Sequence, residues 1–148
     1  MKIVKIIQWD MGHRVLHHRS ICKGLHGHRY KAEICVSGDL VSEFGKSEEG
    51  MVIDFADIKK MSQEFIQSKL DHAFMVWEKD EELLNFFNES KGHKPVIVPF
   101  TPTAENVAVY IYNTLKDKFH DVYKTGLHLH SIKLWETPSS YAFYEQSE

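Results

Sequence analysis

The fold of this chain is decided by an alternating stretch in its first third, Tyr30-Lys31-Ala32-Glu33-Ile34-Cys35-Val36. Successive side chains of a strand point to opposite faces, so this period of two predicts a strand with one buried face. We expect that strand at residues 28–40, after an Ile- and Val-rich strand at residues 2–9. The two strands would pair as a long hairpin around a His-rich loop, residues 10–27.

Two later segments carry apolar residues at helical spacing. The first follows Asp54, which can cap a helix and has Asp57 three residues further on. Its stripe consists of Phe55, Ile58, Met61, Phe65 and, near the end, Lys69 or Leu70. The second follows the capping residue Thr103, with the stripe Ala104, Val107, Ala108, Ile111, Leu115 and Phe119. One-sided stripes of this kind indicate helices that lie on a sheet.

The remaining segments complete the predicted order. We expect an extended segment at 51–53, a short helix at 78–90, and strands at 95–100 and 126–136, the last extended by 141–144. On the last strand a common face is expected for His128, His130, Ile132, Leu134 and Glu136. The order predicts an α+β fold in which helices cover one face of a mostly antiparallel sheet. The other face would need water or a partner subunit.

Length and composition limit the classes of function. A chain of 148 residues without repeats or linkers predicts a single domain, residues 1–148. No apolar run approaches the roughly 20 residues of a membrane helix, and the N-terminus does not resemble a signal peptide. The net charge is −3 and the basic residues are scattered, so neither a membrane nor a nucleic acid is an expected partner. Two cysteines are too few for a disulfide framework, which favours a cytoplasmic location.

Histidine is the unusual component, since five of the ten histidines lie between positions 13 and 28. His26 and His28 are two residues apart at the start of a predicted strand, so both point to one face with Cα atoms about 6.6 Å apart. Two imidazoles at that separation can bind one metal ion, and Gly27 between them would keep space open near it. Alone, a His-x-His pair is weak evidence, because ordinary surface or core histidines are more common.

A third ligand would make the site resemble a catalytic metal centre. His13 ends the first strand and would return beside the pair if the two strands are neighbours, but His17 and His18 are rivals on spacing alone. Three neutral imidazoles leave a fourth position for water or substrate, as in catalytic zinc sites. Iron, nickel and copper also accept imidazole. The second pair, His128 and His130, has no nearby third candidate and is interpreted as solvent-facing.

Cys22 lies four residues before His26. A thiol beside a metal and next to Lys23 can act as a base or a nucleophile. The alternative is a small buried hydrophobe, which is the commoner role of a free cysteine, but the charged and Gly-rich surroundings disfavour deep burial. Cys35 alternates within its strand and is interpreted as structural.

Several other polar residues are candidates for binding and proton transfer. Asp71 directly precedes His72, and a carboxylate beside an imidazole can raise its basicity, although a solvated helix end is the commoner meaning. Glu136 lies beside Leu134 and Trp135, and a partly buried carboxylate needs hydrogen-bond donors such as a guanidine-like edge. The segment that contains Thr103 and Glu105 begins a helix, whose free N–H groups can bind an anion or a ring carbonyl.

Read together, these motifs resemble the 6-pyruvoyl- and 6-carboxy-tetrahydropterin synthases. The matching segments occur in the expected order over about residues 3–144. They are Trp9…His13, Cys22…His26-Gly27-His28, Gly50-Met51-Val52-Ile53-Asp54-Phe55, Leu70-Asp71-His72, Pro102-Thr103-Ala104-Glu105-Asn106 and Trp135-Glu136-Thr137. The resemblance implies the tunnelling fold: a four-stranded antiparallel sheet with two long helices on one face, assembled as a trimeric barrel. Two trimers would stack as a homohexamer.

The resemblance also implies an activity. The substrate would be the pterin 7,8-dihydroneopterin triphosphate, and zinc on His13, His26 and His28 would bind its side-chain hydroxyls. Cys22 would move a proton, in a relay completed by Asp71 and His72 from the same or a neighbouring subunit. Glu136 would anchor the amino-pyrimidine edge, with Thr103 and Glu105 lining the same pocket. The catalytic candidates are thus Cys22, Asp71 and His72.

The family has more than one product. The 6-carboxy branch releases acetaldehyde as well as triphosphate and supplies 7-deazaguanine (queuosine-type) synthesis, and the compact chain favours this branch. The alternatives are a 6-pyruvoyl-tetrahydropterin synthase of biopterin synthesis, an aldolase-like member and a non-catalytic pterin-binding module. The chain departs from the family at residues 73–77, Ala73-Phe74-Met75-Val76-Trp77, where a segment that ends in Leu-Asn is usual. These bulky side chains would change the shape of the pocket beside Asp71 and His72.

Overall fold

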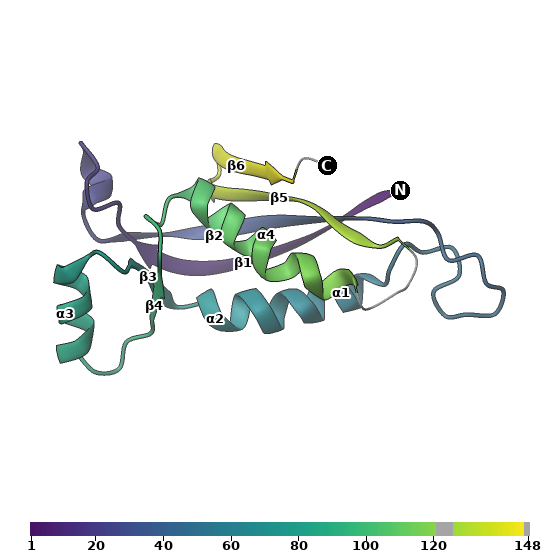
Figure 1. Ribbon diagram of the computed structural model, residues 1–148, viewed down its shortest axis with the longest axis horizontal. Coiled ribbons are helices and arrows are strands. Elements are labelled where there is room, and N and C mark those ends of the chain that lie inside the picture. The colour runs from purple at the N-terminus through teal and green to yellow at the C-terminus, as the bar shows by residue number, and fades with distance from the viewer. Residues whose placement is uncertain (121–125, 147–148) are drawn as a thin grey trace.

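The computed structural model of the chain describes residues 1–120 and 126–146, and within them six strands form one sheet (Figure 1). The strands are β1 (Lys2–His13), β2 (His26–Ser37), β3 (Ala73–Trp77), β4 (Pro95–Val98), β5 (His128–Thr137) and β6 (Ser140–Glu145). Their order is β4-β3-β1-β2-β5-β6. The antiparallel part, β1-β2-β5-β6, corresponds to the expected sheet. The expected count of four strands is too low, because β3 and β4 add to β1 in parallel.

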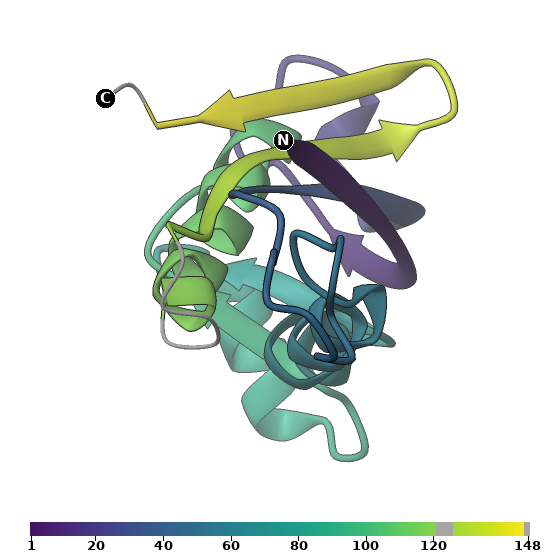
Figure 2. The same ribbon diagram turned by 90° about the vertical axis from the view of Figure 1, so that its right-hand side faces the viewer.

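Two long helical segments cover one face of the sheet. The first runs through α1 (Phe55–Ser62), the π-helical η2 (Gln63–Gln67) and α2 (Ser68–Leu70), and the second is α4 (Ala104–His120). Most of both segments lies below the yellow strands β5 and β6 in the view of Figure 2. The short α3 (Glu81–Glu89) stands apart, beside β3 and β4 (Figure 1). The predicted α+β fold class is therefore confirmed.

The predicted caps are present at both long helices. The Asp54 carboxylate accepts a hydrogen bond from the Ala56 N–H at 2.7 Å, and the Thr103 hydroxyl accepts one from the Asn106 N–H at 3.4 Å. The first apolar stripe is rotated relative to the prediction: Ile58, Ser62, Ile66 and Leu70 are buried, whereas Phe55 is 50% exposed. The π turn at Gln63–Gln67 adds a residue to the helical repeat, which shifts the buried face.

The hairpin of β1 and β2 is longer than predicted, because both strands continue into the His-rich segment. Trp9 lies opposite Tyr30, and the register continues to His13 opposite His26. The loop is therefore residues 14–25 rather than 10–27, with a short 3-10 helix, η1 (Ile21–Lys23), inside it. The extension carries His13 to the same end of the sheet as His26 and His28.

The hydrophobic core lies between the sheet and the two long helical segments. Its largest fully buried side chains are Trp9, Tyr30, Phe119, Ile34, Ile53, Ile58, Ile66, Leu70, Met75, Ile111, Leu115 and Ile132. Each fully buried Ile or Leu side chain stabilises the fold by about 1.5–3 kcal/mol relative to exposure. The strands of the hairpin are thus held rigidly where they position the histidines.

Three further expectations about elements are wrong. On β5 a bulge places Ser131 opposite Cys35 but Leu129 opposite Val36, so His128 and His130 do not share a face with Ile132 and Leu134. Residues 141–144 do not extend β5 but belong to the separate strand β6, which returns along it. Residues 52 and 53 form a bend, so 51–53 is not the expected extended segment, although Val52 and Ile53 are buried.

The segment that departs from the family pattern, residues 73–77, forms strand β3. It pairs with the end of β1, where Met11 lies opposite Ala73 and Gly12 opposite Phe74. The Phe74 ring occupies the space that a Cβ atom at Gly12 would need, so this position requires glycine. The segment that departs from the family pattern therefore packs directly against the strand that carries His13.

Within the described residues no helix is long and apolar enough to cross a membrane.

Candidate metal centre and active site

Three imidazoles converge at the end of the β1–β2 hairpin. One ring nitrogen from each of His13, His26 and His28 lies within 4.8 Å of the others, the one such group in the part of the chain that the structure describes. The ring centroids of His13 lie 4.6 Å from His26 and 5.2 Å from His28. His13 is buried, whereas the other two are partly accessible. The group can therefore hold a metal ion that remains open to a ligand on one side.

Backbone carbonyls orient two of these rings for metal binding. Nδ1 of His13 lies 2.6 Å from the Pro102 carbonyl oxygen, and Nδ1 of His26 lies 2.8 Å from that of Gly24. A carbonyl only accepts, so Nδ1 donates in each ring and Nε2 keeps its lone pair for a metal. Burial, helped by the nearby His26 and His28, lowers the pKa of His13 and keeps the ring neutral. The donor set fits zinc.

The two rival candidates, His17 and His18, are not part of the three-histidine group. Nδ1 of His18 accepts a hydrogen bond from the Ser20 N–H at 3.0 Å, and the His17 ring lies edge-on to Trp77. Of the three candidates only His13 joins the pair. The expected role of Gly27 is wrong: its neighbours in the strand point to the metal face, so Gly27 faces the other side. There a Cβ atom would lie 3.0 Å from the Met11 carbonyl oxygen.

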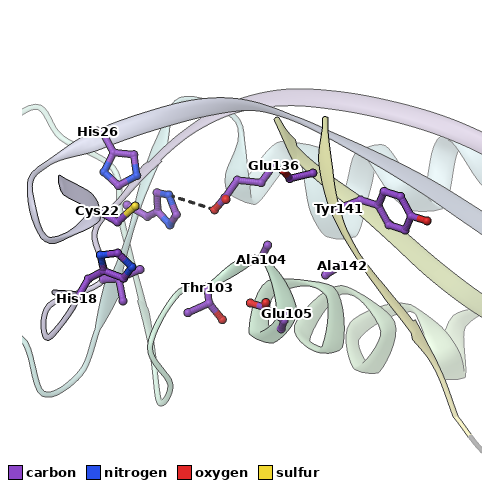
Figure 3. Close-up of a pocket in the computed structure, with 12 residues that line it drawn as sticks. His18, Cys22, His26, Thr103, Ala104, Glu105, Glu136, Tyr141 and Ala142 are labelled. Atoms are coloured by element: carbon purple, nitrogen blue, oxygen red, sulfur yellow. Dashed lines mark ion pairs between the residues drawn. The ribbon is translucent and has the colours of Figure 1, made fainter. Parts of the chain in front are cut away.

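A cavity of about 310 Å³ opens beside the three histidines (Figure 3). Six residues that the sequence predicted for the site line this cavity: His13, Cys22, His26, Thr103, Glu105 and Glu136. The rest of the lining consists of Val15, His18, Ala104, Ser140, Tyr141 and Ala142. The hairpin loop supplies Cys22, and a hydrogen bond of 2.8 Å from the Val15 N–H to the Cys22 carbonyl closes that loop. The thiol is therefore held at the cavity wall next to two metal-ligand candidates.

Glu136 links the cavity to the metal centre. Its Oε1 lies 3.6 Å from Nε2 of His13, the ion pair that the dashed line marks in Figure 3, and 3.9 Å from Nε2 of His28. The side chain is 27% exposed, so the carboxylate is available to a ligand in the cavity. Glu105, on the first turn of α4, supplies a second carboxylate to the same cavity.

Asp71 and His72 do not share this cavity. Asp71 accepts a hydrogen bond from the Asp10 N–H at 3.0 Å, and its other carboxylate oxygen lies 3.1 Å from Nδ1 of His72. These two contacts, the first being the stronger, lower the pKa of Asp71. The backbone of His72 has a φ of 58°, and its side chain is 81% exposed. This side chain lines a different hollow together with His28. Within one chain the structure therefore separates this pair from Cys22.

One contact near the site could not be read from the sequence. Nε of Arg14, the residue after His13, donates to Asp80 at 2.7 Å, and its Nη2 donates to Asp80 at 2.5 Å and to Glu82 at 2.8 Å. Burial raises the pKa of Asp80, but hydrogen bonds from Arg14 and the Leu83 N–H outweigh it, and the pKa is lowered. The sequence shows only that Arg14 directly follows the metal-ligand candidate His13. Its partner Asp80 is 66 residues away and could not be identified from a local pattern.

The sequence model of the 6-pyruvoyl tetrahydropterin synthase family matches residues 2–147 of the chain. The chain belongs to this family. A 6-carboxy-5,6,7,8-tetrahydropterin synthase of Haemophilus influenzae is 38% identical over 148 residues, which cover 98% of this chain and 99% of the relative. The protein of the same name from Rickettsia conorii is 32% identical over 141 residues, which cover 95% of this chain and 97% of the relative.

Solved structures agree with the fold. A crystal structure of an uncharacterised protein from Wolinella succinogenes has a TM-score of 0.79 at 25% identity and covers 99% of this chain and 98% of that one. The 6-pyruvoyl tetrahydropterin synthase of Caenorhabditis elegans has a TM-score of 0.67 at 22% identity, with 99% and 96% covered, and so supports the fold. Members of this tetrahydropterin synthase family are lyases, and the chain is an enzyme of this type.

Proposed function

We propose that the chain is a zinc-dependent 6-carboxy-5,6,7,8-tetrahydropterin synthase. It would convert 7,8-dihydroneopterin triphosphate to 6-carboxytetrahydropterin, with release of triphosphate and acetaldehyde, in 7-deazaguanine (queuosine-type) synthesis. The observation that carries this proposal is the three-histidine group, which opens into a cavity with a thiol and two carboxylates. Full-length relatives with this name at 32–38% identity favour the 6-carboxy over the 6-pyruvoyl product.

The cavity walls suggest how the substrate binds. Glu136 would accept two hydrogen bonds from the amino-pyrimidine edge of the pterin, because a carboxylate pairs bidentately with adjacent N–H groups. Thr103 and Glu105, at the start of α4, line the cavity beside it. With the ring held there, the three-carbon side chain of the substrate lies near Cys22 and His13.

Proton transfer would then fall to Cys22. The thiolate accepts the proton of a C–H group on the side chain, and the electron pair left on carbon expels triphosphate from the neighbouring carbon by elimination. His13, His26 and His28 would hold the zinc ion, which when bound would supply Lewis acidity that makes this C–H group more acidic. His13 and His26 contribute by presenting Nε2 in a fixed direction, since their Nδ1 atoms are held by carbonyls.

Asp71 and His72 would complete the proton relay from a neighbouring subunit. The exposure of His72 and its separation from Cys22 within one chain support this arrangement. Lys94 supports this arrangement, because its ammonium group donates to the Asp71 carbonyl oxygen at 2.9 Å and holds the turn that presents His72.

The assembly would be the barrel-shaped homohexamer of the family. A cytoplasmic location agrees with two free thiols, Cys22 and Cys35, and residues 1–148 would act as one domain.

Product analysis by mass tests the proposal most directly. Zinc-loaded protein is incubated with 7,8-dihydroneopterin triphosphate, and we expect 6-carboxytetrahydropterin, acetaldehyde and triphosphate in equal amounts. Zinc-loaded Cys22→Ala protein is the control. A product that keeps its three-carbon side chain would indicate the 6-pyruvoyl branch. Release of no triphosphate would exclude a synthase and leave an aldolase-like enzyme or a non-catalytic pterin-binding module.

A further inference from the structure

The cavity beside the metal centre has opposite charge character at its two ends. Glu105 and Glu136 lie at one end, with Tyr141, whereas His18, Cys22 and His26 lie at the other (Figure 3). The second end belongs to the hairpin loop, and residues 11–32 contain no Asp or Glu at all. A ligand that fits both ends therefore has hydrogen-bond donors at one end and negative charge at the other.

His18 lines this cavity and carries a hydrogen-bond donor on its ring. Its Nδ1 accepts a hydrogen bond from the Ser20 N–H at 3.0 Å, so the proton of the neutral ring is on Nε2. This is the opposite tautomer to that of His13 and His26, whose Nδ1 atoms donate to carbonyls. The backbone N–H of His18 donates to the Val15 carbonyl oxygen at 2.9 Å, which fixes the place of this residue in the loop. The half-buried ring is thus built to bind an anion rather than a metal.

The loop also carries positive charge without a compensating carboxylate. Arg14 is neutralised by Asp80 and Glu82. In contrast, Arg19 and Lys23, which flank His18 and Cys22 in the loop, form no ion pair with the residues that the structure describes. Both are exposed, so they can approach an anion that enters the cavity mouth.

We infer that His18, assisted by Arg19 and Lys23, binds the triphosphate chain of the substrate. The inference rests on the proposed function and adds to it the residues that bind the triphosphate. Dihydroneopterin triphosphate carries donor N–H groups at its pterin end and the phosphates at the other, with three carbons between. Placed with the pterin at Glu136 and the phosphates at His18, it has its reacting carbons beside Cys22 and the three metal-ligand candidates. The polarised cavity therefore selects one of the two possible orientations.

Binding of inorganic tripolyphosphate to the zinc-loaded protein, measured by titration calorimetry, isolates this contact from turnover. The variants are His18→Ala, His18→Gln, which keeps an N–H donor, and His17→Ala as a matched control outside the cavity. We expect His18→Ala to weaken tripolyphosphate binding about tenfold, as one hydrogen bond to a charged group predicts, and to raise KM for the substrate similarly. His18→Gln is expected to restore most of the affinity, and His17→Ala to leave it unchanged.

Wild-type affinity for tripolyphosphate in His18→Ala would overturn the inference. An equal loss in His17→Ala would do so as well, because it would reveal a diffuse charge effect instead of a site. Loss of zinc from His18→Ala would identify the residue as a ligand and also overturn the inference. Failure of the proposed function is distinguishable: the wild-type protein would then bind tripolyphosphate through His18 without converting dihydroneopterin triphosphate.

Discussion

The carbonyl oxygens of Pro102 and Gly24 decide which nitrogens of His13 and His26 are available to a metal. Each accepts from Nδ1, at 2.6 and 2.8 Å, and so leaves Nε2 as the ligand atom. The Ser20 N–H has the opposite effect on His18. Three histidines in one short segment thus acquire two chemical roles from single backbone contacts.

Replacement of His28 by alanine is expected to abolish stoichiometric zinc binding. Two imidazoles remain, and a two-ligand site holds zinc far more weakly than a three-ligand site. His28 is only partly buried, so the variant should still fold. Zinc content by plasma mass spectrometry and folding by circular dichroism check this, with His93→Ala as a control. One zinc per chain in His28→Ala would mean that the ligand set is wrong.

Cys22→Ala is expected to keep zinc and to lose turnover by about 10²- to 10⁴-fold, the usual contribution of a positioned proton-transfer group. Since Cys22 lines the cavity without contributing to the histidine group, KM should change little. Steady-state kinetics with the zinc-loaded variant measure both effects. Unchanged turnover would remove the thiol from the mechanism.

Glu136→Gln is expected to raise KM by roughly tenfold to hundredfold, because a hydrogen bond to a charged group contributes about 1.5–3 kcal/mol. The size of the side chain is conserved, so the metal centre should be retained. A matched variant, Glu105→Gln, alters the more exposed carboxylate of the same cavity and should have a smaller effect. A larger effect at Glu105 would show that the pterin anchor has been misassigned.

At the scale of elements, the ion pair of Arg14 and Asp80 joins β1 to the start of α3. The Asp80 side chain is 3% exposed and also caps α3 through the Leu83 N–H at 3.2 Å. The neighbouring strand β3 packs its Phe74 side chain against Gly12 of β1. The β3–α3–β4 segment is therefore a support for the end of β1 at which His13 lies.

Asp80→Ala is expected to destabilise the fold by about 3 kcal/mol, since it leaves a nearly buried guanidinium without its main partner. Because the pKa of Asp80 is lowered in the folded state, its contribution is complete above the unfolded value of about 3.9. The contribution is lost as the pH falls through the folded pKa. Urea unfolding of wild-type and Asp80→Ala proteins between about pH 7 and pH 3 measures this. A stability difference that does not narrow at low pH would contradict the assignment.

On the scale of the whole molecule, the chain separates groups that the proposed reaction needs together. Cys22 lines the cavity beside the histidines, whereas the exposed His72 lines another hollow. Apolar side chains such as Val4, Ile6 and Phe143 are about half exposed on the face of the sheet away from the helices. Burial of that face against further copies would bring a second subunit close to each cavity.

Mixed oligomers test this arrangement. Cys22→Ala and His72→Ala are each expected to be nearly inactive alone. After co-expression, assemblies that hold both variants should regain activity, because some cavities then combine an intact Cys22 with an intact His72 from the neighbour. Light scattering is expected to give a mass of six chains. Absence of any recovered activity in assemblies proven to be mixed would place the relay within one subunit.

Local periodicity accounts for what the sequence by itself determined. The alternation in residues 30–36, the stripe on α4 and the separation of His26 and His28 are properties of neighbouring residues, so the hairpin, the main helices and the His-x-His pair were predictable. Spacing did not separate His13 from its rivals, and the family resemblance implied it as the third ligand. The tertiary structure then placed His13 beside the pair, formed β3 from residues 73–77 and joined Arg14 to Asp80. These features depend on contacts between residues far apart in the chain, such as His13 and Pro102, 89 positions apart. No pattern within a short window carries that information.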